Sequence, residues 1–159
     1  MSQLYRDDDI NVYTCVDELK RIHEPFIRHN KIHTVACEMK DLWCNKGLFW
    51  FLVTDPNINV ELHGWTHEDY SVWDKISLRR ELAKARAYWE YNSCRILGRM
   101  PFSDLKRITT FFPPWNRVSP NLVDVCNELK LKLSYKTEDC KWMFHYWSTT
   151  VKEVEEMTR

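Results

Sequence analysis

The sequence predicts an α/β fold in which a parallel sheet of about five strands is flanked by helices. Segments with strand patterns alternate about five times with segments of helical periodicity, and the connections between them are short. No repeat, low-complexity tract or linker divides the 159 residues, so we expect a single domain over residues 1–159. Alternation of this kind produces an open sheet or a barrel, and in both forms the functional site lies at the carboxyl ends of the strands.

Five segments have the composition of strands. Residues 32–37 are rich in β-branched and apolar side chains, which is typical of a buried strand. Residues 58–62 alternate apolar and polar side chains and predict another. Together with a short entry strand, an apolar run before two prolines and an aromatic run near the end, the predicted strands cover residues 4–6, 32–37, 58–62, 108–112 and 142–147.

Apolar residues at every third or fourth position predict the helices that connect these strands. We expect Thr14 to cap the first helix and Gly98 to end the longest one. Ser119 followed by a proline is typical of a helix start. The predicted helices cover residues 16–27, 40–52, 77–97, 120–133 and 149–157.

Composition narrows the functional classes. The 23 Lys and Arg residues balance 23 Asp and Glu residues, which disfavours a nucleic-acid binder because phosphate binding needs an excess of cations. No apolar run approaches the roughly 18 residues of a membrane-spanning helix, and the first residues lack the layout of a signal peptide. We therefore expect a cytoplasmic protein that acts on neither nucleic acids nor membranes. The six cysteines include no C-x-x-C spacing, so a thiolate zinc site has no support.

Polar clusters stand at or near the ends of the predicted strands. The acidic run 7–9 follows the first strand, His63 and His67 follow the third, and His145 lies in the last. Two histidines and one carboxylate form a standard site for a hydrolytic metal ion. A second carboxylate can accept a proton from water, and a further histidine can return one to the leaving group. Because the chain offers each of these parts, the pattern predicts metal-assisted hydrolysis.

Each of these features also has a structural interpretation. An acidic run by itself is usually a solvated turn or a helix cap, and a single histidine such as His145 is often a core residue. A second pair with the same spacing, His29 and His33, lies at the wrong end of a strand for chemistry, so we interpret it as structural. His63 and His67 differ because they bracket a glycine at a strand end.

Four motifs, in order from residue 4 to residue 147, resemble those of small polysaccharide deacetylases with NodB homology, which form carbohydrate esterase family 4. The resemblance implies a distorted, truncated (β/α) barrel of about five parallel strands, because the chain is shorter than is usual for this fold. The third-motif arginine of that family is absent here, and its fourth-motif aspartate has no clear counterpart. The matching segments are Arg6-Asp7-Asp8-Asp9, His63-Gly64-Trp65-Thr66-His67, Phe112-Pro113-Pro114-Trp115-Asn116 and Met143-Phe144-His145.

The resemblance also implies roles for individual residues. Asp8 would be the catalytic base and Asp9 a metal ligand, although a register one residue earlier, with Asp7 as base and Asp8 as ligand, stays open. His145 would be the catalytic acid. The implied ligands of a divalent ion, expected to be zinc, are Asp9, His63 and His67, and the implied substrate-binding residues are Trp65, Pro114, Trp115 and Asn116.

From these roles we expect a metal-dependent hydrolase that removes an acetyl group from an N-acetylated sugar or a sugar-like substrate, either a small molecule or an oligosaccharide. One alternative is a catalytically degenerate protein that binds a carbohydrate or a nucleotide. Another is a related hydrolase of a non-peptide C–N bond in a substrate that is not a sugar.

Overall fold

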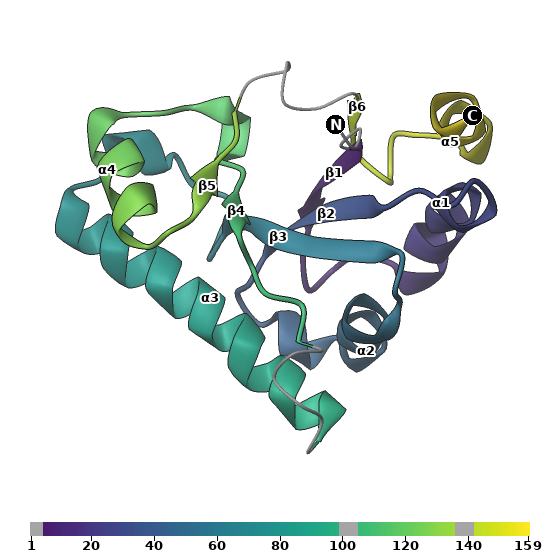
Figure 1. Cartoon of the computed structure of the whole chain (residues 1–159), viewed down its shortest axis with the longest axis horizontal. Coiled ribbons are helices and arrows are strands. Elements are labelled where there is room, and N and C mark those ends of the chain that lie inside the picture. Colours follow the sequence, from purple (N-terminus) through teal and green to yellow (C-terminus); the bar gives the residue numbers. More distant parts are fainter. Residues whose placement is uncertain (1–4, 99–104, 136–141) are drawn as a thin grey trace.

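Six parallel strands form one curved sheet in the part of the chain that the computed structural model describes, residues 5–98, 105–135 and 142–159 (Figure 1). The strand order is β5-β4-β3-β2-β1-β6, and each pair of neighbours runs parallel. The predicted α/β fold, a truncated and distorted barrel, is confirmed, with six strands instead of about five. The strands are β1 (Tyr5–Ile10), β2 (His33–Glu38), β3 (Ile58–Gly64), β4 (Thr110–Phe111), β5 (Lys132–Leu133) and β6 (Trp142–Phe144).

The additional strand is β5, and its sequence had a helical interpretation. The apolar stripe predicts a helix through Leu133, but the helix that follows Ser119 ends at Glu128. Lys130 adopts a left-handed backbone conformation with φ 55°, which turns the chain out of the helix. The chain then returns alongside β4, where Leu133 is the register partner of Phe111.

β4 is shorter than predicted because a side chain takes its hydrogen bonds. Glu61 of β3 is buried, and its Oε2 accepts from the backbone N–H groups of Thr109 and Thr110 at 2.8 and 2.7 Å. The Thr109 hydroxyl donates to the other carboxylate oxygen at 2.8 Å. The run 108–112 therefore contributes only two residues to the ladder. The first residue of the predicted strand 4–6 lies outside the described residues, and the strand itself continues to Ile10.

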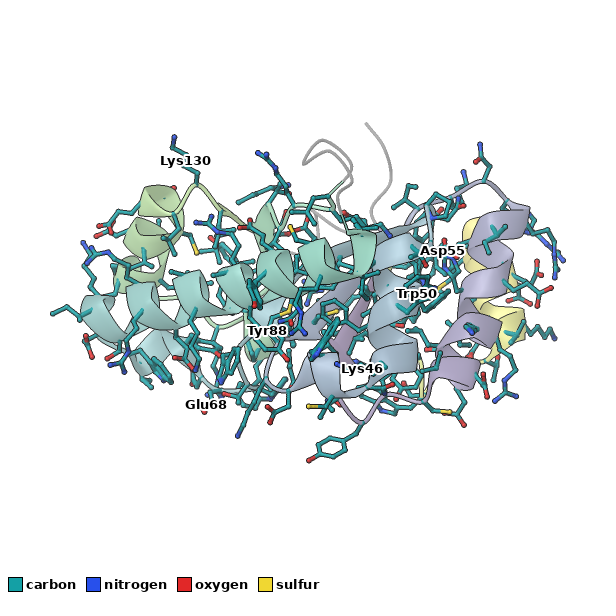
Figure 2. The ribbon with its side chains drawn as sticks, turned by 90° about the horizontal axis from the view of Figure 1, so that it is seen from below. Lys46, Trp50, Asp55, Glu68, Tyr88 and Lys130 are labelled. Carbon is teal, nitrogen blue, oxygen red and sulfur yellow. The ribbon has the colours of Figure 1, made fainter. Side chains whose placement is uncertain are left out.

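The helices lie along the outside of the curved sheet, and α3 crosses much of the length of the molecule (Figures 1 and 2). In the described ranges, no helix is long and apolar enough to cross a membrane. The α-helices are α1 (Val16–Arg28), α2 (Lys46–Thr54), α3 (Lys75–Leu97), α4 (Pro120–Glu128) and α5 (Val151–Thr158), and the short 3-10 turns include η1 (Leu42–Cys44), η2 (Tyr70–Val72) and η4 (Pro114–Asn116).

Three helix ends can be compared with the caps that the sequence predicts. Ser119 caps α4, because its hydroxyl accepts from the Leu122 N–H, and Gly98 ends α3 with φ 66°. The prediction for Thr14 is wrong: α1 begins after Cys15, which supplies no side-chain cap. The Thr14 hydroxyl instead accepts from the N–H of Asn11 and closes the turn that leads out of β1.

Two apolar clusters hold the layers together. The larger one fills the space between the sheet and α2, α3 and α4, and includes Trp89, whose ring N–H donates to the Lys106 carbonyl at 2.7 Å. The smaller one seals the β1–β6 edge against α1 and α5. It consists of Tyr5, Ile22, Phe26, Phe144 and Val154.

Two buried histidines adjoin the smaller cluster. His23 of α1 and His33 of β2 face each other with their Nδ1 atoms 3.2 Å apart, and the His33 ring stacks on Phe26 at 4.3 Å. His23 Nε2 lies 3.2 Å from an Asp55 oxygen. Burial lowers the pKa of His23 to about 4 and that of His33 to about 3, so both rings are neutral in the fold at neutral pH.

Acid should therefore destabilise this protein through His23 and His33. The unfolded chain takes up protons at these residues below about pH 6.5, whereas the folded chain does not, so the free energy of unfolding falls as the pH drops from 6.5 towards 4. Each pH unit costs about 1.4 kcal/mol per histidine. We expect His23→Gln to lose stability less steeply than the wild type when urea unfolding is followed from pH 7 to 4.5. The half-buried His29 provides the control, His29→Gln. Parallel curves for wild type and His23→Gln would contradict the interpretation.

Candidate metal centre

The three consecutive carboxylates at the end of β1 point to three different partners. Asp7 is fully buried, and its Oδ1 accepts from the Tyr146 N–H at 2.9 Å. Asp8 forms an ion pair with Arg6. Asp9 stands within a register shift between β1 and β2 and has φ 62°, a left-handed conformation. Its carboxylate lies among histidines, so only the last member of the run belongs to the predicted ligand set.

Asp9, His63 and His67 converge in space. Asp9 Oδ1 lies 3.0 Å from His63 Nε2 and 3.2 Å from His67 Nε2, and one ligand atom from each residue falls within 4.8 Å of the others. Burial alone raises the pKa of Asp9, but the proximity of the histidines outweighs it and lowers that pKa below its usual value. Asp9 therefore carries its negative charge at neutral pH.

The hydrogen bonding of His63 indicates that a cation fits at this point. His63 Nδ1 lies 2.7 Å from the Phe112 carbonyl oxygen, which can only accept, so Nδ1 carries the proton. In the neutral ring, Nε2 then presents a lone pair to Asp9 Oδ1, a buried oxygen without a hydrogen-bond donor. Two acceptors 3.0 Å apart repel each other unless they share a proton or a metal ion. The donor set, one carboxylate and two imidazole nitrogens, suits a divalent metal ion.

The loop that carries His67 is fixed by a glycine and a tyrosine. β3 ends at Gly64, where φ is +136° and an added Cβ would lie 2.6 Å from the Tyr70 hydroxyl. That hydroxyl accepts from the N–H groups of Trp65 and Thr66 and donates to the Thr66 carbonyl at 2.8 Å. The tyrosine can reach the loop backbone only because residue 64 has no side chain.

His145 and two exposed tryptophans border the metal centre. β6 ends one residue before His145, whose Nδ1 lies 3.6 Å from Asp9 Oδ2. The His145 ring stacks on Trp147 with centroids 4.7 Å apart. On another side, the Trp115 ring meets His67 edge to face at 4.4 Å. Both indoles are about half exposed, so each site histidine that faces solvent is supported by a flat ring.

Arg6 organises the second carboxylate. Its Nε and Nη2 contact the two oxygens of Asp8 at 2.6 and 2.5 Å, and both side chains are buried. Nη2 also lies 3.2 Å from the Asn116 side-chain oxygen, and the guanidinium covers the ring of Phe112 at 4.6 Å. Phe112 occupies the place of the third-motif arginine. The guanidinium of Arg6, from β1, therefore lies over Phe112, the position at which the third motif of that family has its own arginine.

The other predicted substrate-binding residues divide into two groups. Pro114 is buried at the start of η4, and Asn116, with φ 55°, turns its side chain to Arg6. The Trp65 ring packs edge to face on Tyr88 of α3, labelled in Figure 2, with the Lys84 amine 3.7 Å above it. Trp65 therefore contacts α3, and its role in substrate binding stays a prediction.

Sequence reasoning assigned no role to Arg6, Glu38 or Trp147. Glu38 ends β2 opposite Gly64, and its raised pKa reflects burial first. It is close enough to Asp9 and the two ligand histidines to influence their charges. Its position directly after a predicted strand was the available signal. The pair His29 and His33 is divided between two partners, since His29 contacts Glu155 at 3.0 Å and His33 faces His23.

Solved structures with the same fold include family 4 carbohydrate esterases and a related pseudoenzyme. A family 4 carbohydrate esterase from Streptomyces lividans, in complex with acetate, matches with a TM-score of 0.72 and 12% identity over 99% of this chain and 85% of that chain. A family 4 carbohydrate esterase from Bacillus anthracis matches with a TM-score of 0.72 and 14% identity over 99% and 74%. A CE4 family pseudoenzyme from Bacillus anthracis matches with a TM-score of 0.71 and 18% identity over 98% of this chain.

The present chain spans 59% of the length of that pseudoenzyme. No sequence model of a protein family matches the chain, and no curated protein matches it in sequence. At identities below one fifth, structural similarity establishes the arrangement of the backbone and leaves the chemistry to be argued from the site. The chain has the fold of the family 4 carbohydrate esterases, the polysaccharide deacetylase fold that its motifs resemble.

Proposed function

We propose that this chain is a metal-dependent N-deacetylase that acts on an N-acetylated sugar or a sugar-like substrate. The observation that carries the proposal is the convergence of Asp9, His63 and His67, in which the lone pair of a fixed imidazole faces a buried carboxylate oxygen. His145 borders this centre, and Asp8 stands next to Asp9 in the chain. A structure with the same fold holds acetate, which is the acid that such a reaction releases.

Asp9, His63 and His67 would hold a divalent ion, and we propose zinc because two histidines and one carboxylate are a common ligand set for Zn²⁺ in hydrolases. Such an ion, when bound, supplies Lewis acidity that polarises a carbonyl and lowers the pKa of water. The Phe112 carbonyl contributes by fixing the His63 tautomer, and the Tyr70 hydroxyl by fixing the loop of His67.

Asp8 is the residue that we assign as the general base, which takes a proton from the attacking water. The register Asp8/Asp9 is favoured over Asp7/Asp8 because Asp9 lies among the histidines, whereas Asp7 is fully buried against the Tyr146 N–H. The two-pronged contact with Arg6 holds both oxygens of Asp8 in one plane and restricts its rotamer. We therefore assign Arg6 as a positioning residue for the base.

His145 is the residue that we assign as the general acid. Its Nδ1 is turned towards Asp9, so Nε2 is the atom that would donate a proton to the departing amine nitrogen. The stacking of Trp147 restricts the ring, in place of the missing fourth-motif aspartate. Trp115, exposed beside His67, provides a flat face for the substrate, and Pro114 and Asn116 support it from η4.

A second candidate function is carbohydrate binding without catalysis. The observation that favours it is the pseudoenzyme among the structures with this fold, together with the missing fourth-motif aspartate. A hydrolase of a C–N bond in a substrate that is not a sugar would use the same groups on another leaving amine. Acetate release from N-acetylglucosamine oligomers and from other acetylated amines, with and without a chelator, distinguishes the three functions.

Metal binding should depend on the three converging residues. We expect elemental analysis of the purified protein to find about one zinc ion per chain, which a chelator removes. His63→Ala and Asp9→Asn should lose it, because each removes one of three ligands. His29→Ala removes a half-buried histidine from another part of the surface and is the matched control, expected to keep the metal. Undiminished zinc in His63→Ala would refute the ligand assignment.

The base and its positioning residue should separate catalysis from metal binding. Asp8→Asn should keep the metal and reduce kcat for acetate release about 10²-fold to 10⁴-fold, since it removes the proton acceptor. Arg6→Lys keeps the positive charge but loses the planar fork, so we expect kcat to fall about tenfold with little change in KM. Thermal unfolding shows whether each variant still folds after this change to the buried ion pair. An Asp8→Asn protein with wild-type kcat would show that another group, with Glu38 the nearest carboxyl to test, is the base.

A further inference from the structure

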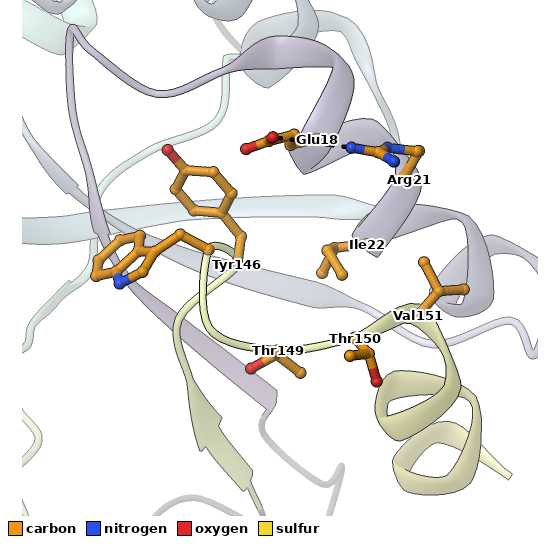
Figure 3. A pocket seen from close by; sticks show the side chains of 8 residues that line it. Glu18, Arg21, Ile22, Tyr146, Thr149, Thr150 and Val151 are labelled. Atoms are coloured by element: carbon orange, nitrogen blue, oxygen red, sulfur yellow. Dashed lines mark ion pairs between the residues drawn. The ribbon is translucent and has the colours of Figure 1, made fainter.

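A hollow lies between α1 and the segment that follows β6 (Figure 3). Its volume is about 230 Å³. α1 contributes Glu18, Arg21 and the apolar floor residue Ile22, and the segment after β6 contributes Tyr146, Trp147 and Thr149. These two segments are more than a hundred residues apart in sequence, so the hollow exists only in the folded chain.

This hollow, which we call the α1 cavity, shares a wall with the proposed catalytic acid. The Trp147 ring stacks on His145 at 4.7 Å and also lines the α1 cavity. Tyr146, the residue after His145, meets the Trp147 ring edge to face at 5.1 Å, and its hydroxyl accepts from the N–H of Cys15, just before α1, at 3.4 Å. A ligand group in the α1 cavity would therefore lie next to the ligand group that contacts His145.

The lining suits a neutral ring that carries hydroxyl groups. Flat aromatic and apolar surfaces are available from Trp147 and Ile22, and the rim carries an ion pair in which Arg21 Nη2 lies 3.8 Å from Glu18 Oε1. Both charged side chains are half exposed or more, so they can turn to donate to or accept from a ligand. Glu18 would repel an anion and Arg21 would repel a cation. Hydroxyl groups, in contrast, can donate a hydrogen bond to Glu18 and accept one from Arg21.

We propose that the α1 cavity is a subsite for the sugar ring adjacent to the one that loses its acetyl group. This inference rests on the proposed function. Because His145 would protonate the leaving nitrogen, the sugar that carries this nitrogen lies on the His145 side of the cleaved bond. The next ring of the chain then passes Trp147 and enters the α1 cavity. The substrate is accordingly an oligosaccharide of at least two rings.

The test compares kcat/KM for acetate release from N-acetylglucosamine and from its β-1,4-linked dimer and tetramer. We expect wild type to prefer the oligomers. Arg21→Ala should lower kcat/KM for the tetramer about fivefold, the loss expected for one ordinary hydrogen bond, and leave the monomer unchanged. Thr149→Trp, which fills the α1 cavity, should abolish the preference for oligomers. Arg80→Ala, an exposed arginine of α3, is the matched control and should behave as wild type.

Two results separate this inference from the proposed function. If wild type and both variants show the same ratio of tetramer to monomer activity, the α1 cavity is not a subsite, although the deacetylase stands. If no acetylated sugar yields acetate, the proposed function fails, and calorimetric titration with the acetylated tetramer then decides the subsite. Weaker binding by Arg21→Ala and Thr149→Trp than by wild type would support it, and equal or absent binding would overturn it.

Discussion

Of three successive carboxyl groups at the end of β1, Asp7 and Asp8 are buried and Asp9 is partly buried, and each needs its own compensation. The cost of burying an unpaired carboxylate is several kcal/mol, more than a protein of this size can carry three times over. The alternating direction of side chains along β1, together with the left-handed turn at Asp9, sends the three groups to different partners. The arrangement of those partners forms the candidate site.

Each carboxylate is compensated by a different kind of chemistry. Burial raises the pKa of Asp7 well above its usual range, so this group keeps its proton, and its contact with the Tyr146 N–H ties the end of β6 to β1. Asp8 is neutralised by the guanidinium of Arg6. Asp9 faces imidazole nitrogens, one of which is fixed as an acceptor, and this arrangement calls for a cation. A structural carboxyl, a candidate base and a candidate ligand thus occupy consecutive positions.

The sequence predicted the parts of the fold that depend on regular patterns. Periodicity placed the main helices and strands, and the rule that parallel strands end at one edge predicts that Asp9, His63 and His67 lie near one another. Local exceptions were not predictable in this way. β5 depends on a left-handed turn at Lys130, and the shortness of β4 depends on Glu61 competing for its N–H groups.

The direction in which a side chain points was the second feature that the sequence did not predict. A strand-end position for Trp65 did not reveal that the turn at Gly64 sends its ring to Tyr88. The spacing of Arg6 and Asp8, two residues apart on one strand, does predict that both lie on the same face. The motif comparison included Arg6 in its first matching segment but assigned it no role beside Asp8.

The abundance of tryptophan links the stability of the site to its recognition of a substrate. A sheet of six short strands leaves little apolar material around the metal centre, and the two exposed indoles supply it. Trp115 braces His67 and Trp147 braces His145, each with part of its ring still open to solvent. A sugar ring that stacks on either indole would shield the histidine behind it from water, and the exclusion of water strengthens the electrostatic interactions of that histidine. In the proposed enzyme, substrate binding and the preparation of the catalytic groups would therefore depend on the same two side chains.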